Sequence, residues 1–158
     1  MIRSARPADA SRLAETLIFA KRVAYRPIFQ DDAVSFNQMQ VLALALRLRD
    51  DPDALRDVYV YDDGIVKGMM RWGRESGARQ LSELYVDPFF QGQGVGRALM
   101  DHFLACARAD GAPRVYLWVL EDNRAARAFY ERADLSPDGE RRLEPGTDKY
   151  LLRYAAAL

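Results

Sequence analysis

The first third of the chain has apolar residues at helical spacing. Residues 2–6 predict a short strand, and after Pro7 and Asp9 the apolar positions recur every three or four residues, as on one face of a helix. A second helical stretch, over residues 32–49, follows the same spacing. We expect this stretch to bury a set of five apolar side chains: Phe36, Met39, Leu42, Ala45 and Leu46.

From residue 58 onward the pattern is typical of strands that alternate with helices. Asp63-Gly64 is a turn signal between two apolar runs and predicts a β-hairpin. The predicted elements are strands at 58–61, 65–72, 80–86 and 114–120, helices at 95–109 and 123–132, and two strands within 138–154. This order predicts a mixed α/β fold with helices on both faces of a sheet.

Composition limits the classes of partner. The 158 residues carry 23 basic and 23 acidic side chains, so the formal net charge is zero. A neutral protein has no general attraction for nucleic acid or for an anionic membrane, and we expect neither as a partner. There is no apolar run of about 18 residues, so no transmembrane helix is expected. The length is typical of one domain, here residues 1–158.

The single cysteine and the N-terminus both favour a cytoplasmic protein. Cys106 has no partner for an internal disulfide, and residues 1–7 lack the basic start and apolar run of a signal peptide. His102 and Cys106 lie four residues apart on a predicted helix, too few ligands for a metal site, so no metal is expected.

The most informative segment is the glycine-rich turn Gln91-Gly92-Gln93-Gly94-Val95-Gly96, between a predicted strand and a predicted helix. Glycine lets the backbone take positive φ and approach a ligand closely. The first amides of a helix have no acceptor within the helix, and its dipole favours a negative charge there. The turn therefore predicts a phosphate-binding site. It does not fit the P-loop, because Arg97-Ala98 stands where Lys-Ser/Thr is needed, and it does not fit the dinucleotide fingerprint.

Together with the preceding Leu84-Tyr85-Val86 and Asp87-Pro88, this segment resembles the GNAT superfamily of acyl-CoA N-acyltransferases. A later segment, from Asn123 to Tyr130, resembles the Asn-x-x-Ala-x-x-x-Tyr motif of the same family. The resemblance implies a mixed, mostly antiparallel central sheet of about six or seven strands flanked by about four helices. It implies acetyl-CoA as the acyl donor. The residues that it assigns to the cofactor are Leu84, Tyr85, Val86, Gln91, Gly92, Gln93, Gly94, Val95, Gly96, Arg97, Ala98, Asn123 and Tyr130.

Two residues are candidates for proton transfer. Tyr130, whose ordinary pKa of about 10 keeps it protonated at neutral pH, is expected to donate to the sulfur of CoA. Glu83, on the strand before the turn, is the candidate base. Each has an alternative interpretation: Tyr130 as an aromatic residue that packs at a helix end, and Glu83 as an ion-paired strand carboxylate. Asn123 is equally well explained as a helix N-cap.

The predicted reaction is acetyl transfer to a primary amine of a small molecule or a peptide N-terminus, by direct attack in a ternary complex. Two alternatives stay open, a CoA-binding sensor without turnover and an acyltransferase for another acyl-CoA. The family often forms dimers, so a homodimer is also an expectation. One departure from the family pattern is Ala133-Asp134-Leu135, because relatives usually have glycine where the chain must turn.

Overall fold

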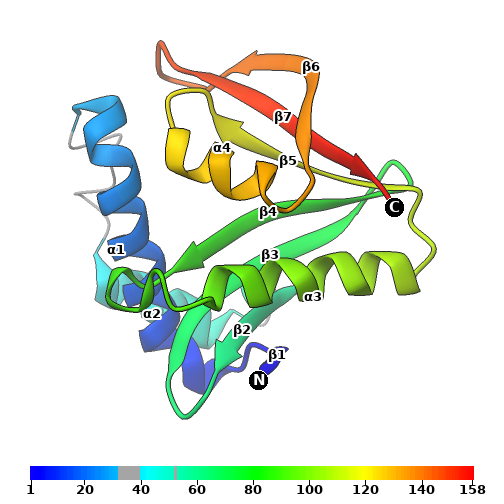
Figure 1. Cartoon of the computed structure of the whole chain (residues 1–158). Coiled ribbons are helices and arrows are strands. Elements are labelled where there is room, and N and C mark those ends of the chain that lie inside the picture. Colours follow the sequence, from blue (N-terminus) through cyan, green and yellow to red (C-terminus); the bar gives the residue numbers. More distant parts are fainter. Residues whose placement is uncertain (32–39, 52) are drawn as a thin grey trace. The chain divides into compact units, whose positions relative to one another are not determined.

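The computed structural model describes residues 1–31, 40–51 and 53–158 (Figure 1). The strands are β1 (Ile2–Ser4), β2 (Val58–Asp62), β3 (Val66–Glu75), β4 (Ala78–Val86), β5 (Arg114–Leu120), β6 (Ser136–Leu143) and β7 (Tyr150–Ala157). The helices are α1 (Ala10–Phe29), α2 (Val41–Asp50), α3 (Val95–Ala109) and α4 (Arg124–Glu131), with short 3₁₀ helices η1 (Pro7–Asp9) and η2 (Pro88–Phe90).

Among these residues the strands form a seven-stranded sheet in the order β1-β2-β3-β4-β5-β7-β6. The pairs β1–β2, β2–β3, β5–β7 and β6–β7 are antiparallel, and β4–β5 is parallel. The predicted class, a mixed and mostly antiparallel sheet with four helices, is confirmed.

The chain forms two compact units, and we describe each by itself. The first comprises Met1–Arg71 with Glu83–Leu99, and the second comprises Trp72–Ser82 with Met100–Leu158. The prediction of one domain over residues 1–158 stays a prediction.

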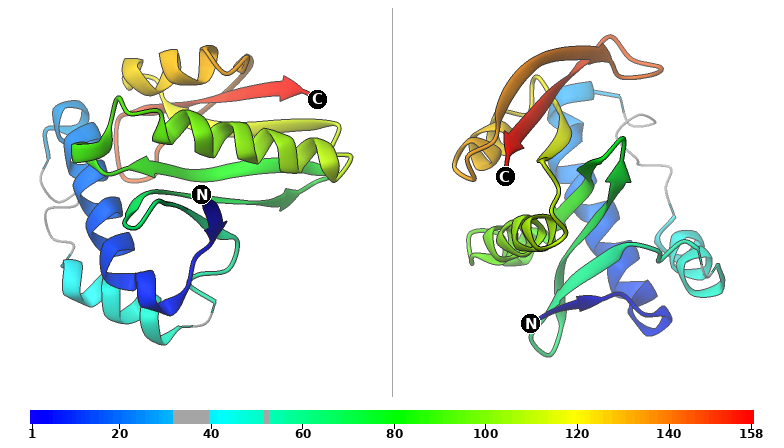
Figure 2. Two further views of the ribbon diagram at one scale, coloured as in Figure 1. Left: turned by 60° about the horizontal axis from the view of Figure 1, so that its bottom comes forward. Right: turned by 90° about the vertical axis from the view of Figure 1, so that its right-hand side faces the viewer.

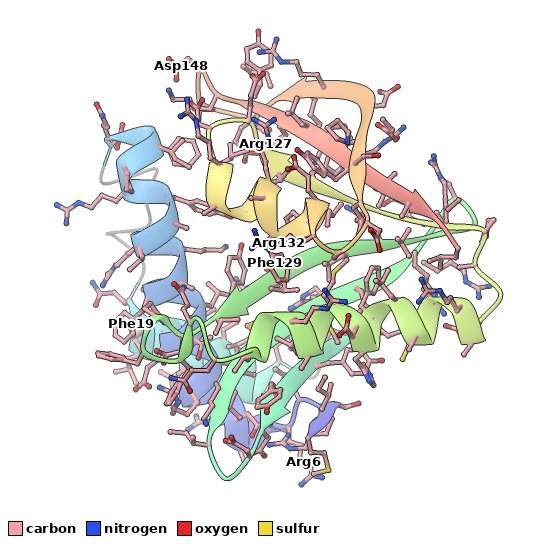
Figure 3. All side chains as sticks on the ribbon, in the orientation of Figure 1. Arg6, Phe19, Arg127, Phe129, Arg132 and Asp148 are labelled. Atoms are coloured by element: carbon pink, nitrogen blue, oxygen red, sulfur yellow. The ribbon has the colours of Figure 1, made fainter. Side chains whose placement is uncertain are left out.

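In the first unit β3 separates two packed layers. Met69 belongs to a buried cluster with side chains of α1, α2 and β2, such as Leu13, Leu48 and Val58. Its neighbour Gly68 faces the other way, toward Val95 and Leu99 of α3. Successive residues of a strand point to opposite faces, so β3 carries a helix layer on each side. The outer face of α1 carries residues such as Phe19, which is 38% exposed (Figure 3).

The burial expected for the second helix is only partly confirmed. Ala45 is buried, but Leu42 and Leu46 are 70% and 40% exposed. Helix α2 packs against α1 and η1 through a narrow stripe, which includes Ala45 and Leu48. Leu42 and Leu46 lie beside that stripe, where no third layer covers them among the described residues. Phe36 and Met39 lie outside the described residues.

In the second unit α4 packs on the face of the sheet that carries Tyr154 of β7. Arg127 extends from α4 toward this strand (Figure 3), and its Nε donates to the Tyr154 hydroxyl at 3.0 Å. The hydroxyl in turn donates to Glu131 at 2.8 Å. Tyr154 is fully buried, so this chain satisfies its polar atom and fixes α4 on β7. Strands β6 and β7 run as a paired ribbon in both views of Figure 2.

An ion cluster fastens the N-terminal strand to its neighbours. The Arg3 guanidinium donates two hydrogen bonds to Asp9, both 2.8 Å long, and bonds Asp62 of β2 at 2.7 and 3.0 Å. Hydrogen bonds from Arg3 hold the pKa of Asp9 below its ordinary value of 3.8. No helix in the described part of the chain is long and apolar enough to cross a membrane.

Replacing Arg3 with Gln should lower the melting temperature by roughly 2–4 °C at neutral pH, since a part-exposed ion cluster is worth little more. A carboxylate whose pKa is lower in the folded state stabilises the fold at a pH above its unfolded-state pKa. This contribution is lost as the pH falls through the pKa of the folded state. The difference between wild type and Arg3→Gln should therefore shrink as pH falls below about 3.8. Thermal unfolding followed by circular dichroism over a pH series measures this difference in melting temperature. The exposed neighbour Arg6 is the control (Figure 3): a difference for Arg6→Gln as large as that for Arg3→Gln would contradict the assignment.

Candidate functional site

The turn between β4 and α3 has the geometry that its glycines predict. Gly92 and Gly94 have φ of 75° and 83°, and no atom lies within 4 Å of the position where either would carry a Cβ. The amide of Ala98 donates to the Gly94 carbonyl at 2.9 Å, so the regular hydrogen bonding of α3 begins there. Residues 91–94 are exposed. An open backbone turn that leads directly into a helix N-terminus fits a phosphate group.

Two glutamine side chains support the shape of the turn. Gln91 Nε2 donates to the Val86 carbonyl at 3.4 Å, and Gln93 Nε2 donates to the Phe89 carbonyl at 3.2 Å. Both bonds run from the turn back to the strand end and to η2. The side chains of Gln91 and Gln93 therefore bind the protein itself, and what the turn presents to a ligand is backbone.

A buried carboxylate fixes the point where the turn begins. Asp87 accepts a hydrogen bond from the Phe89 amide at 2.9 Å, and this bond caps η2. Asp87 also forms an ion pair with Arg12 of α1, with an N–O distance of 2.7 Å. The Asp87 side chain is 3% exposed. Arg12 also donates to the Val66 carbonyl of β3 at 3.0 Å. The pair thus connects α1, β3 and the end of β4, and its two members are 75 residues apart in the sequence.

A glycine on β3 permits the close approach of α3. A Cβ on Gly68 would lie 2.9 Å from Val95 Cγ1, 3.2 Å from Leu99 Cδ1 and 3.1 Å from the Tyr85 carbonyl oxygen. Val95 and Leu99 are buried, so neither can turn away into solvent. The missing side chain at Gly68 therefore sets how closely the first turn of α3 packs on the sheet.

Strand β4 carries the candidate base on the way to the turn. Its pairing with β5 covers Arg79, Gln80 and Leu81, and Leu84, Tyr85 and Val86 follow beyond these paired residues. Glu83 Oε2 lies 3.3 Å from Arg71 Nε, and another nitrogen of Arg71 donates to the Ala54 carbonyl at 2.8 Å. Glu83 is therefore an ion-paired carboxylate in this structure. Its role as a base stays a prediction.

Next to this strand end, α1 contributes aromatic and cationic groups. The hydroxyls of Tyr25 and Tyr85 are 3.4 Å apart, and Lys21 Nζ lies 5.4 Å from the centre of the Tyr85 ring. An open hollow of about 390 Å³ lies farther round α1, lined by Arg22, Val23, Arg26 and Pro27. It contains no residue that the sequence assigned to the cofactor, so its volume is no guide to the cofactor site.

The second unit holds the remaining predicted residues. Asn123 caps α4, because its side-chain oxygen accepts from the Ala126 amide at 3.2 Å. Tyr130 lies in the last turn of α4, with its ring centre 6.4 Å from that of the buried Tyr154 and 5.3 Å from that of Phe129. Asp134 takes the left-handed position that glycine usually holds, with φ of 62°. The amides of Ala133 and Leu135 both donate to the Tyr130 carbonyl, so the departure from the family pattern leaves an ordered helix end.

His102 and Cys106 lie on the same face of α3, since Cys106 Sγ and His102 Nε2 are 3.5 Å apart. Burial raises the pKa of Cys106, and the nearby Asp110 adds to the shift, which makes the thiol a poor nucleophile. Within the described residues no group of three or more His, Cys, Asp or Glu side chains could hold a metal ion.

The family model for acetyltransferases of the GNAT type matches residues 21–134, which is most of the chain and includes β4, the turn, α3 and α4. The chain belongs to the acetyltransferase (GNAT) family. It also shares the GNAT fold of the PaiA N-acetyltransferase of Thermoplasma acidophilum, solved with coenzyme A, at a TM-score of 0.72 and 16% identity over 97% of this chain and 96% of that one. The ribosomal-protein-S18-alanine N-acetyltransferase from Escherichia coli aligns at a TM-score of 0.65 and 19% identity, over 99% of this chain and 92% of that one.

Relatives found by sequence similarity match shorter stretches of the chain. A mycothiol acetyltransferase of Beutenbergia cavernae is 39% identical over 89 residues, 55% of this chain and 30% of the relative. An uncharacterised N-acetyltransferase of Mycobacterium tuberculosis is 39% identical over 67 residues, 42% of this chain and 43% of the relative. The chain thus spans less than half the length of these two relatives.

The sequence predicted the turn and α4, but not the residues that hold the turn and the end of β4 in place. Arg12 and Arg71 carried no signal of their own, because each acts through a partner that is distant in the sequence. Gly68 gave the clearest hint, since a glycine inside a predicted strand often marks the close approach of another segment.

Replacing Gly68 with Ala should lower the free energy of unfolding by about 1–3 kcal/mol, because the new methyl group overpacks Val95 and Leu99. Urea unfolding measures the change. Gly73 is a matched control on the same strand: no atom lies within 4 Å of its Cβ position, so Gly73→Ala should be close to neutral. Equal stabilities of the two variants would show that Gly68 does not set the packing of α3.

Proposed function

We propose that the protein is an acetyl-CoA-dependent N-acetyltransferase that transfers the acetyl group to a primary amine by direct attack in a ternary complex. The observation that carries this proposal is the exposed turn at Gly92 and Gly94, which opens directly into α3. Membership of the GNAT family and the coenzyme A bound to the Thermoplasma acidophilum relative support the same ligand.

The first unit would hold the donor through its backbone. The turn amides from Gly92 to Gly96 and the first amides of α3 would bind the pyrophosphate, and Arg97, exposed in that first helical turn, would add a positive charge. Leu84, Tyr85 and Val86 lie beyond the residues of β4 that pair with β5, so their backbone groups would face the pantetheine arm. The Val86 amide is the candidate donor to the thioester oxygen.

Acetyl-CoA supplies an acetyl group activated as a thioester. The transfer forms a C–N bond and breaks the C–S bond, while the attacking nitrogen loses a proton and the sulfur gains one. Tyr130 would donate the proton to sulfur, and Asn123 would orient the donor through its amide nitrogen, since its oxygen already caps α4. Glu83, or water next to it, would accept the proton from nitrogen.

The acceptor would be a small amine or a peptide N-terminus. The mycothiol acetyltransferase of Beutenbergia cavernae and the ribosomal-protein N-acetyltransferase of Escherichia coli represent these two classes of GNAT substrate. Both share only part of their length or only the fold with this chain, so neither assigns the acceptor.

One observation favours a second function, a CoA-binding sensor without turnover. Glu83, the candidate base, forms an ion pair with Arg71, so its carboxylate is already engaged within the protein. An acetyl-transfer assay with a broad set of amines separates the two functions, because a sensor would bind CoA and release no free thiol with any amine.

The cofactor assignment can be tested by thermal shift with acetyl-CoA, CoA, NAD and ATP. CoA ligands at about a hundred times their dissociation constant should stabilise by roughly 2.7 kcal/mol and raise the melting temperature by roughly 5–10 °C. Gly94→Glu should abolish this shift, because it adds bulk and negative charge at the phosphate position. Gly77→Glu is the matched control, with a similar φ of 80° and the same open surroundings. No shift of the wild type with either CoA ligand would refute the cofactor site.

Tyr130→Phe should leave CoA affinity nearly unchanged and lower kcat by about 100-fold or more, because general-acid catalysis is lost. Steady-state kinetics with an accepted amine give kcat, and calorimetry gives the affinity. Tyr150→Phe, at an exposed tyrosine of β7, should keep full activity. A Tyr130→Phe enzyme with unchanged kcat would assign Tyr130 to packing against Tyr154 instead.

A further inference from the structure

Helix α4 carries two of the predicted site residues, one at each end, and buries little of its own surface. Asn123 caps its start, and Tyr130 lies in its last turn. None of its eight residues is buried, whereas Leu120 before the helix and Ala133 and Leu135 after it are. A helix this short has little stability of its own. Specific polar contacts therefore have a large share in fixing its position.

These contacts meet at Arg127, in the middle of α4 (Figure 3). Its Nε donates to the Tyr154 hydroxyl of β7 at 3.0 Å, and its Nη1 donates to the Glu121 carbonyl at 2.9 Å. Glu121 lies two residues before the N-cap, and its amide donates to the Tyr150 carbonyl of β7 at 2.9 Å. Arg127 thus connects α4 both to the strand and to the segment that leads into the helix.

Tyr154 also reaches the end of the helix. Its hydroxyl donates to Glu131 at 2.8 Å, and Glu131 follows Tyr130 in the chain. The ring centres of Tyr154 and Tyr130 are 6.4 Å apart. One residue of β7 therefore contacts the middle of α4, the candidate acid and the carboxylate next to that acid.

The hydroxyl of Tyr154 is not needed to fill the core. Tyr154 is fully buried and pairs with the buried Leu117 of β5, so phenylalanine would bury the same ring with no polar atom to satisfy. A buried hydroxyl costs free energy unless it is hydrogen-bonded, and this one takes both of its partners, Arg127 and Glu131, from α4. Its contribution is therefore to the placement of the helix.

We propose that Tyr154 is a positioning residue for Tyr130, because its hydroxyl holds the last turn of α4 at the position that proton donation to the leaving sulfur requires. This inference rests on the proposed function, in which Tyr130 is the acid. Without the hydroxyl, Arg127 and Glu131 lose their common partner, and the last turn of α4 shifts on the strand. A displacement of about 1 Å at a reacting group can cost about 100-fold in rate.

Tyr154→Phe removes the hydroxyl and keeps the ring. It should lower kcat by about tenfold or more and leave the KM for acetyl-CoA nearly unchanged, because it displaces the acid and leaves the glycine-rich turn intact. The double variant Tyr130→Phe/Tyr154→Phe should be no slower than Tyr130→Phe alone, because a residue that acts through the Tyr130 hydroxyl then has nothing to act on. A role in stability alone would not produce this dependence. Steady-state kinetics with an accepted amine measure the three variants.

Tyr116→Phe is the matched control. Tyr116 is another buried tyrosine of this unit, and its hydroxyl donates to Glu75 at 2.6 Å. Its neighbour Leu117 pairs with Tyr154, so Tyr116 points to the opposite face of the sheet. Tyr116→Phe should lose a buried hydrogen bond and keep full kcat.

Glu131→Ala is a second variant, in case Tyr154→Phe does not fold. Glu131 is exposed, so its loss leaves the core intact and removes one of the two partners of the Tyr154 hydroxyl. It should lower kcat in the same direction as Tyr154→Phe, and this effect should also disappear in the Tyr130→Phe background.

NMR of the protein labelled at tyrosine Cζ gives a measurement without turnover. Addition of CoA should shift the Tyr130 resonance, which is identified by its loss in Tyr130→Phe. Tyr154→Phe should reduce this shift, and Tyr116→Phe should keep it. No shift in the wild type, the same shift in Tyr154→Phe, an unchanged kcat, or a further slowing of the double variant would overturn the inference. Failure of the proposed function differs: the shift would depend on Tyr154, but the wild type would release no free thiol from acetyl-CoA with any amine.

Discussion

The ion pair between Asp87 and Arg12 is the constraint on which the candidate site depends. Asp87 stands between the last residue of β4 and the turn, and its side chain is almost completely buried. Removing Arg12 would leave the buried Asp87 carboxylate without its counter-charge, which destabilises the fold. The carboxylate also caps η2 through the Phe89 amide. A single buried acid therefore determines where β4 stops, how the turn starts and which part of α1 lies beside them.

The glycine-rich turn could be predicted from the sequence because its determinants are local. The positive φ of Gly92 and Gly94 and the start of α3 depend on residues within one short segment. The burial of α2 could not be predicted in the same way, because helical spacing shows that a face is apolar but not what covers it. Leu42 and Leu46 satisfy the spacing and are exposed, since α2 packs through the stripe of Ala45 and Leu48.

Roles that depend on a distant partner were also out of reach of the sequence. Glu83 could be assigned to a strand beside the turn, but its ion pair depends on Arg71, twelve residues earlier on another strand. Asn123 gave the opposite result, because its local alternative, the N-cap of α4, is the interaction that the structure shows. The sequence thus identified the segments that carry the chemistry, and the structure shows how much of each side chain is already engaged within the protein.

Gly68 makes three positions of the chain evolutionarily interdependent. It occupies a space that is bounded by Val95, Leu99 and the backbone of Tyr85, so a side chain added at position 68 lowers the stability unless the residue at 95 or 99 becomes smaller. The two helical residues cannot grow for the same reason. In a lineage that diverges from this chain, the sizes of the three residues are therefore coupled, and the least costly order of substitutions is one in which the helix loses volume before the strand gains it.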